Sequence, residues 1–259
     1  PMLHIAQEIT RDPTARLLIF RADPAVLDPI FRAIRLMGCS LRRTMMTGFG
    51  EPLVCRELLV VRGLTQHGTY MSPRAVEGCT RITRSIAPGD RRNLFVRRIP
   101  GYLRSGKLLN EDELCRRLEA RGFSTIEPGS MSLEEQISAF KGAERIVGVS
   151  GAAMTNIAFC EPGTQITLLA PADFPDVFFW FIAQHRGLVY RELRGRTIEV
   201  AGKEKWAGDF SLTEEDIEWL ETLGASSVPS TVPFVRTRIE IEAGDPRTPH
   251  LAVGRLVTD

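Results

Sequence analysis

A turn of small residues follows an apolar run in RIVGVSGAAMTN, residues 145–156, and this pattern is suited to binding an anion. The run predicts a buried strand that ends at Val149, and the following residues predict a helix from about Ala152. Small side chains let the backbone approach a diphosphate closely, while unpaired N–H groups and the helix dipole face it. The alternative is a strand-to-helix turn that binds nothing, because the fingerprint G-x-G-x-x-G is absent. The candidate binding residues here are Ser150, Gly151, Ala152, Ala153, Thr155 and Asn156.

Arginine side chains near this turn could supply positive charge to the same anion. Residues 74–107 contain nine basic residues and two acidic ones. Arg98 ends a predicted strand and Arg104 lies in the following loop, so both could reach the carboxyl edge of a sheet, where arginine matches phosphate oxygens. Fixed positive charge there can replace a metal ion in stabilising a departing phosphate. We favour Arg98 over Arg97, because only alternate strand residues share a face. The alternative is a surface arginine paired to a neighbouring carboxylate such as Glu111.

Composition argues against several other classes of protein. The 259 residues are 43% hydrophobic and 25% charged, which is ordinary for one large globular domain or two small lobes. The net charge of +1 is too balanced for a protein whose whole surface binds nucleic acid. Five scattered cysteines without C-x-x-C and four histidines without H-x-x-x-H predict neither a disulfide framework nor a metal site. We therefore expect reduced thiols, a cytoplasmic location and, since no apolar run approaches about 20 residues, no transmembrane segment.

Strands and helices alternate along the chain. Apolar runs at 15–20 and 52–61 predict strands on either side of a helix at 24–37, and a further helix begins after the cap residue Ser72. Three pairs with capping-box spacing predict later helix starts: Asn110 with Glu113, Ser132 with Glu135, and Ser211 with Glu214. The strands predicted in this later part are 93–98, 123–128, 145–149, 164–170, 188–193 and 197–200.

This alternation predicts an α/β fold with parallel sheets, helices on both faces and ligands beyond the carboxyl ends of the strands. We place a boundary between two lobes near the break at Pro88 and Gly89. The N-terminal lobe covers residues 1–90 and is expected to be truncated upstream, and the C-terminal lobe covers 91–225. Residues 226–259 are expected to form a peripheral tail with a possible hairpin, because their apolar residues alternate around DPRTP.

Several motifs in this order resemble the bacterial members of glycosyltransferase family 61. They are LFVRR, R-x-x-x-L-L-N-E-D-E-L, GFSTIEP, SLEEQI and AERIVGVSGAAMTN, and the run from Arg98 to Asn156 is specific. FCEPGT, WAGDFSL and the earlier HGTYMSP also resemble family segments, so the resemblance extends from residue 1 to about residue 223. Two positions depart from the family pattern: Ser150 stands where many relatives have histidine, and Ala153 stands where a second glycine is common.

The resemblance implies a GT-B-like arrangement of two Rossmann-like lobes with parallel sheets, with a nucleotide sugar held by the C-terminal lobe and an acceptor near the cleft. It also implies inverting transfer that needs no metal. The positions that match the family's binding residues are Arg98, Asn110, Glu111, Gln136, Gly151, Thr155 and Asn156.

An inverting transfer needs a base that deprotonates the acceptor hydroxyl. His67, in the loop between the expected lobes, is our candidate, because histidine ordinarily titrates near pH 6.5. The alternative is a histidine that only hydrogen-bonds its own loop. Glu51 and Asp209 are weaker candidates for the base. The expected catalytic residues are therefore His67 and Arg98.

We expect an enzyme of the EC 2.4 class, a hexosyl- or pentosyltransferase that uses a nucleotide sugar, with UDP as the expected nucleotide, and a glycan acceptor. The expected process is synthesis of a bacterial surface polysaccharide such as a capsule. No cofactor beyond this co-substrate, no metal and no nucleic-acid partner are expected, and peripheral association with the inner membrane is compatible with the sequence. A second hypothesis is a non-catalytic nucleotide- or carbohydrate-binding module of a larger glycan-assembly protein. A nicotinamide-dependent oxidoreductase is disfavoured, because its glycine fingerprint and its acidic ribose partner are absent.

Overall fold

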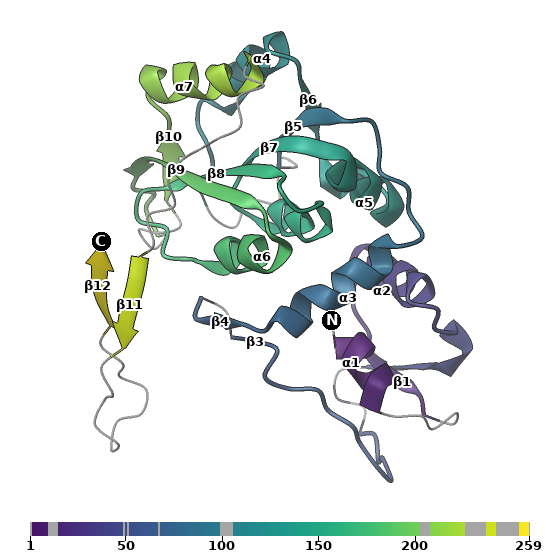
Figure 1. The fold of residues 1–259 in the computed structure, drawn as a ribbon. Helices are drawn as coiled ribbons and strands as arrows, with labels where there is room; N and C mark the ends of the chain where they lie inside the picture. Colours follow the sequence, from purple (N-terminus) through teal and green to yellow (C-terminus); the bar gives the residue numbers. More distant parts are fainter. Residues whose placement is uncertain are drawn as a thin grey trace. The chain divides into compact units, whose positions relative to one another are not determined.

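The computed structural model has an α/β fold built around one six-stranded sheet (Figure 1). The strand order is β10-β9-β8-β7-β5-β6, and all neighbouring strands are parallel except β10 and β9. The predicted α/β class and parallel sheet are therefore confirmed. The strands are β5 (Arg92–Val96), β6 (Phe123–Ile126), β7 (Ala143–Val149), β8 (Gln165–Pro171), β9 (Val189–Ile198) and β10 (Asp209–Ser211).

The chain divides into two compact units, Pro1–Ala225 and Ser226–Asp259. In the second unit, β11 (Thr237–Ile241) pairs antiparallel with β12 (Gly254–Thr258). No helix among the described residues is both long and apolar enough to cross a bilayer. The structure describes residues 2–9, 15–48, 50, 52–66, 68–98, 106–202, 208–225, 237–241 and 254–258.

Helices cover both faces of the six-stranded sheet, because successive strand residues point to opposite faces and both sets are apolar. Leu94 and Val96 of β5 belong to a buried cluster with α3, α5, α6 and η3, whereas Phe95 belongs to a second cluster with α4 and α7. Burial on both faces fixes the register of each strand, and therefore which residues reach its carboxyl end. The covering elements are α3 (Pro73–Thr83), α4 (Glu111–Ala120), α5 (Leu133–Gly142), η3 (Ala152–Phe159), α6 (Phe178–Arg186) and α7 (Glu214–Ala225).

The first ninety residues contribute smaller sheets. β1 and β2 form a parallel pair connected through α2, and β3 and β4 form an antiparallel pair. These elements are α1 (Met2–Ile9), β1 (Leu17–Phe20), α2 (Pro24–Leu36), η1 (Leu41–Arg43), β2 (Thr44–Thr47), β3 (Thr65–Gln66) and β4 (Tyr70–Met71).

The strand predicted at 52–61 does not form, and residues 52–64 belong to no helix or strand. Its apolar, β-branched sequence favours an extended chain, but β1 pairs instead with the less apolar segment TMMT, residues 44–47. Strand formation depends on a neighbouring backbone and on side-chain burial, which local propensity does not reveal. This part of the prediction is therefore wrong.

Local capping explains where several helices begin. Ser72 accepts a hydrogen bond from the backbone N–H of Arg74, as predicted for the start of α3. The predicted capping box at α5 is confirmed, because Ser132 and Glu135 each accept a hydrogen bond from the backbone N–H of the other. Each such cap satisfies N–H groups that the first helical turn leaves unpaired.

Two other predicted capping boxes are wrong. Asn110 makes no side-chain cap at α4, because its amide is hydrogen-bonded to Leu212 instead. At α7 the reciprocal pair is Thr213 with Asp216, two residues beyond the predicted Ser211. The spacing rule identified a helix start in both regions. At α4 the side chain of Asn110 binds a distant backbone instead, and at α7 a neighbouring pair with the same spacing forms the cap.

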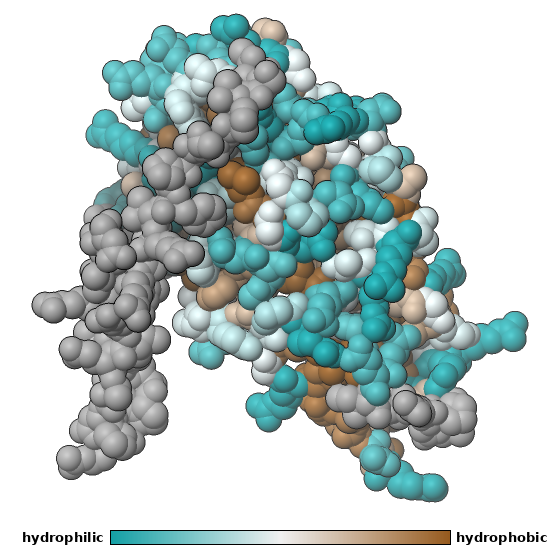
Figure 2. All heavy atoms as spheres, in the orientation of Figure 1, coloured by the Kyte–Doolittle hydropathy of each residue, from teal (hydrophilic) through white to brown (hydrophobic). Residues whose placement is uncertain are grey.

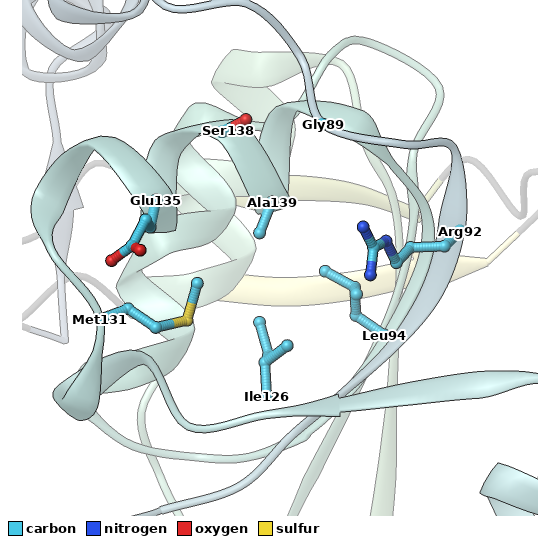
Figure 3. Close-up of a pocket in the computed structure, with 8 residues that line it drawn as sticks. All are labelled: Gly89, Arg92, Leu94, Ile126, Met131, Glu135, Ser138 and Ala139. Carbon is cyan, nitrogen blue, oxygen red and sulfur yellow. The ribbon is translucent and has the colours of Figure 1, made fainter.

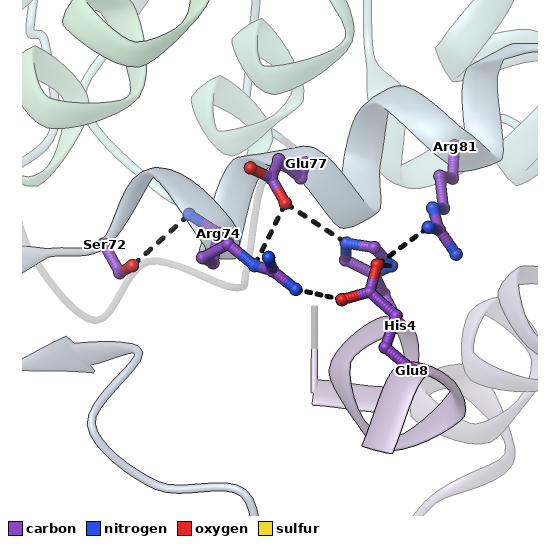
Figure 4. Close-up of polar contacts among 6 residues, drawn as sticks. All are labelled: His4, Glu8, Ser72, Arg74, Glu77 and Arg81. Carbon is purple, nitrogen blue, oxygen red and sulfur yellow. Dashed lines mark hydrogen bonds and ion pairs between the residues drawn. The ribbon is translucent and has the colours of Figure 1, made fainter. Parts of the chain in front are cut away.

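An ion-pair network holds α1 against α3 (Figure 4). His4 is only 2% exposed and lies between two carboxylates, with Nδ1 3.5 Å from Glu8 Oε1 and Nε2 3.3 Å from Glu77 Oε2. Arg74 contacts both carboxylates, and Arg81 Nη2 lies 2.9 Å from Glu8 Oε1. The hydrogen bond from Arg74 holds the pKa of Glu8 below its usual value. Charge pairing thus attaches α1 to the body of the first unit.

Candidate functional site

The carboxyl ends of β5 and β7 lie side by side, and the candidate residues follow them directly. The parallel register places Val96 of β5 beside Gly148 of β7. Arg98 comes two residues after β5, and Gly151 comes two residues after β7. Sheets of this kind bind ligands beyond the carboxyl ends of their strands. The two strand ends therefore bring an arginine and a glycine turn to the edge where a ligand is expected.

The guanidinium of Arg98 lies directly against the α-carbon of Gly151. A side-chain Cβ added at Gly151 would be 2.5 Å from Nη2, 2.6 Å from Nε and 2.9 Å from Cζ of Arg98. Arg98 Nη1 also donates a 2.8 Å hydrogen bond to the carbonyl of Gly106. Only glycine at position 151 leaves room for the guanidinium in this position.

Arg98 is partly shielded from water at this edge. Burial is the main cause that lowers its pKa, and the negative charge of Glu111 partly offsets that effect. The guanidinium nevertheless stays positive at neutral pH, because the ordinary pKa of arginine is above about 12. Reduced solvent screening strengthens its attraction for an anion relative to an arginine in open water. The edge thus carries a fixed positive charge beside a glycine turn.

The turn after β7 leads into η3, so a helix begins at Ala152 as predicted, and it is a 3-10 helix. Ser150 N–H donates to the carbonyl of Leu169 at 2.8 Å, so the turn remains attached to β8. Met154 N–H bonds to the carbonyl of Gly151 at 2.9 Å. The first hydrogen bond within η3 is therefore made by Met154. The N–H groups of Ala152 and Ala153 come before it, and N–H groups in this position have no acceptor within the helix.

The side chains of the predicted turn differ in their accessibility. Ala152 and Thr155 are exposed, Ala153 is half-buried, and Ser150 is only 5% exposed. The exposed hydroxyl of Thr155 is thus accessible to a ligand at the surface, whereas the Ser150 side chain belongs to the interior of the turn.

Gln136 and Asn156 connect η3 to the first turn of α5. Asn156 Nδ2 donates to Gln136 Oε1 at 2.8 Å, and Gln136 Nε2 donates to the carbonyl of Met131 at 3.0 Å. These two predicted binding residues are therefore brought together, and their hydrogen bonds fix the position of η3 beside the turn at Gly151.

Asn110 and Glu111 lie at the start of α4 and have different partners. The Asn110 amide donates to the carbonyl of Leu212 at 3.0 Å and accepts from its N–H at 3.2 Å, which joins α4 to the segment after β10. Glu111 Oε2 lies 3.5 Å from Arg97 Nη2, and Arg97 also bonds Asp112. Glu111 Oε1 is buried without a hydrogen-bond partner. Burial is the main cause that raises the pKa of Glu111, and Arg97 opposes that rise.

Replacing Glu111 with glutamine is expected to leave the protein at least as stable at neutral pH. A raised pKa means that the folded state favours the protonated carboxyl, so this residue's contribution to stability is lost as pH rises from its unfolded pKa through its folded pKa. Above that range the ionised, half-buried carboxylate destabilises the folded state, and glutamine, which is uncharged, removes this cost. Melting temperatures measured from pH 4 to pH 8 should show a gain for Glu111→Gln that grows with pH. A gain at pH 4 that disappears at pH 8 would contradict this assignment.

Three residues predicted from the sequence, His67, Arg104 and Glu51, lie outside the described residues. Asp209, the other candidate base, begins β10, and its Oδ1 accepts a hydrogen bond from the N–H of Lys107 at 3.1 Å. That carboxylate therefore helps to fix the chain between β5 and α4.

Sequence reasoning missed Gly106, whose carbonyl accepts the hydrogen bond from Arg98. Gly106 is buried with φ +47, and a Cβ there would be 3.3 Å from Pro171 Cγ. A glycine in the loop GYLRSGK between a strand and a helix was the available signal, because such glycines often allow close approach of two backbones.

A small cavity lies away from this edge, beneath α5 (Figure 3). Its volume of about 240 Å³ is below the roughly 300–1,000 Å³ of typical ligand pockets. Its charged lining residues are already engaged, Arg92 with Asp90 and Glu135 with Ser132. The remaining lining is mostly apolar, so this cavity is not suited to a diphosphate. The lining residues are Gly89, Arg92, Leu94, Ile126, Met131, Glu135, Ser138 and Ala139.

Comparison with models of known protein families identifies a relationship. The family model described as Glycosyltransferase 61 matches residues 9–167, which is more than half of the chain. The matched range includes Arg98, Gly151 and the hydrogen-bonded pair Gln136 and Asn156. No curated protein matches the chain. Among the residues that the structure describes, no group of three histidine, cysteine or acidic side chains is placed to hold a metal ion.

Proposed function

The chain belongs to glycosyltransferase family 61, and from this premise we propose that it transfers a sugar from a UDP-sugar to a glycan acceptor in surface polysaccharide synthesis. The observation that carries the proposal is the contact between the Arg98 guanidinium and the turn at Gly151. A diphosphate at this edge meets one cation and the N–H groups at the start of η3 within the same small volume.

Arg98 acts on the leaving group in this proposal. As the bond between the sugar and the diphosphate breaks, negative charge develops on the departing phosphate oxygen. A guanidinium held in place before the reaction stabilises that charge without reorganisation, the role that a metal ion plays in other transferases. Reduced exposure to water makes the interaction stronger than at an open surface.

The hydrogen-bonded frame around Arg98 positions the cation. The Gly106 carbonyl fixes one guanidinium nitrogen. Asn110 attaches α4 to the segment after β10, and the pair Gln136 and Asn156 attaches η3 to α5. Binding groups supported in this way keep their geometry when the ligand enters, which lowers the entropic cost of binding.

The acceptor side completes the proposed reaction. We propose an inverting displacement in a GT-B-like arrangement, with His67 as the base that removes the proton from the acceptor hydroxyl. The base acts from the side of the sugar opposite the diphosphate, within hydrogen-bond reach of the acceptor hydroxyl. The first ninety residues, which contain His67, are the part proposed to hold the acceptor.

Thermal stabilisation by nucleotides tests the donor assignment. UDP, GDP, CMP and NAD are each added at increasing concentration, and the melting temperature is recorded. A ligand at about a hundred times its dissociation constant adds roughly 2.7 kcal/mol, which corresponds to an increase of about 5–10 °C in a unit of this size. UDP is expected to give the largest increase and NAD none. Absence of any increase with the diphosphates would remove the anion site from the proposal.

Turnover then separates an enzyme from a binding module. Release of UDP from UDP-sugars, measured with and without added glycan, is expected to require the folded chain and to increase with a suitable acceptor. Binding of UDP without release from any UDP-sugar would favour a non-catalytic nucleotide-binding module instead.

A further inference from the structure

Exposed apolar side chains are concentrated in residues 15–62. Among the residues that the structure describes, seventeen large apolar side chains are exposed, and ten of them lie in this segment. Single exposed apolar residues are normal on proteins, but a concentration of this kind marks a surface that contacts something other than water. Figure 2 shows apolar surface gathered in the lower part of the view, with polar side chains at its border.

The segment that follows β2 contributes half of these side chains. Val54 is 96% exposed and Leu58 is 62% exposed, and Leu53, Leu59 and Val60 are exposed beside them. The exposure of these side chains is not that of the outer face of a sheet, because residues 52–64 belong to no strand. Five large apolar side chains within eight residues are therefore exposed to solvent.

The parallel pair β1–β2 is exposed on both faces. Met45 and Met46 are consecutive residues of β2, so they point to opposite faces, and both are exposed. Phe20, at the end of β1, is 62% exposed. Parallel strands are normally covered on both faces, and this pair departs from that rule. The apolar residues of β1, β2 and the segment 52–60 are hereafter called the 15–62 surface.

The same segment also carries a net positive charge. Residues 15–62 contain eight arginines against four acidic residues, a net charge of +4. The whole chain has a net charge of +1, so the remaining residues together carry −3. Arg42 lies in η1, two residues before β2, and Arg56 lies within the exposed apolar run, and both are exposed. Apolar side chains and arginines are thus interspersed on one surface.

We propose that the 15–62 surface docks the protein onto an anionic lipid bilayer. The acyl region accepts the apolar side chains, and the anionic headgroups attract the arginines that surround them. A second copy of the chain is a poorer occupant, because it would bring a segment of net charge +4 against another of the same sign. The proposal is independent of the nucleotide site, which lies on other elements.

Vesicle sedimentation with the full chain tests the proposal. The chain is mixed with vesicles of phosphatidylcholine alone or with about 30% phosphatidylglycerol, and the bound fraction is measured at low and high salt. We expect at least about ten-fold stronger binding to the anionic vesicles, with a loss at high salt because the attraction is screened. Equal binding to both vesicles, or binding to neither, overturns the proposal.

Paired variants identify the surface. Val54→Ser with Leu58→Ser removes apolar contacts, and Arg42→Glu with Arg56→Glu reverses charge, while the exposure of all four side chains predicts an unchanged melting temperature. Each pair is expected to weaken binding to anionic vesicles at least about ten-fold. Matched changes at exposed positions elsewhere, Ile198→Ser and Arg91→Glu, are expected to leave it unchanged. Equal effects of test and control variants overturn the assignment.

Light scattering excludes the competing occupant. If the chain forms dimers that the variant with Val54→Ser and Leu58→Ser abolishes, and anionic vesicles do not compete with dimer formation, the surface is an interface between two copies and the proposal fails. A chain that remains monomeric in solution and binds only anionic vesicles supports it.

Discussion

Replacing Arg98 with alanine is expected to lower kcat/KM for a UDP-sugar by about 1,000-fold, or roughly 4 kcal/mol of transition-state stabilisation. The reason is that this guanidinium, held against the Gly151 turn, is the cation proposed to stabilise the charge on the departing diphosphate. Affinity for UDP should fall as well, because the product carries the same phosphates. The measurement is UDP release under steady-state conditions, with UDP binding followed by calorimetry.

Two further variants make the result specific. Arg98→Lys keeps the charge but loses the planar fork, so an intermediate loss is expected. Arg91→Ala is the matched control, because Arg91 precedes the opposite end of β5 and is 83% exposed, and it should keep full activity. Arg98 also bonds the Gly106 carbonyl, so the melting temperature of each variant is measured. A folded Arg98→Ala protein that binds UDP as tightly as the unmodified chain would remove Arg98 from the site.

The choice between Arg97 and Arg98 was made from strand periodicity. Consecutive strand residues point in opposite directions, which led us to favour Arg98 over Arg97. In the structure, Arg97 pairs with Asp112 and Glu111, whereas Arg98 lies against Gly151. The strand was predicted to end at Arg98, whereas β5 ends at Val96, so both arginines lie just beyond the strand and their different directions are set by their partners.

The first ninety residues were harder to predict, for a physical reason. The run PLVCRELLVV has stronger strand character than TMMT, yet β1 pairs with TMMT. A strand is stabilised by a partner backbone and by burial of its side chains, and a single sequence specifies neither. Residues 52–61 were expected to form a buried strand. Because they do not, their apolar side chains are exposed and contribute to the 15–62 surface.

Side-chain partners far apart in sequence were also inaccessible from the sequence. Asn110 has the residue type and the spacing of a helix cap, but its amide bonds the backbone of Leu212, 102 residues later. By contrast, the cap of Ser132 with Glu135 depends only on residues within one turn, and it was predicted correctly. Local hydrogen bonds can be read from spacing, whereas those made between elements depend on how the sheet brings the elements together.

Replacing Gly151 with alanine is expected to weaken UDP binding by about 100-fold while the protein stays folded. The added Cβ would lie within 2.5–2.9 Å of three atoms of the Arg98 guanidinium, so that group must move away from the turn. The displaced atoms are the far end of a flexible side chain, but Gly151 has φ +157, which a residue with a Cβ adopts only with strain, so a moderate loss of stability is expected as well. Calorimetry with UDP, together with the melting temperature, measures both effects. Unchanged UDP affinity would show that the guanidinium position is unimportant.

A control glycine and a combined variant separate displacement of Arg98 from other effects. Gly163→Ala introduces the same methyl group at a positive φ with nothing within 4 Å, so it is expected to cost some stability but no UDP affinity. In the background of Arg98→Ala, Gly151→Ala should cause little further loss, because the group that it displaces is already absent. Losses that add fully in the combined variant would mean that Gly151 acts through the turn backbone and not through Arg98.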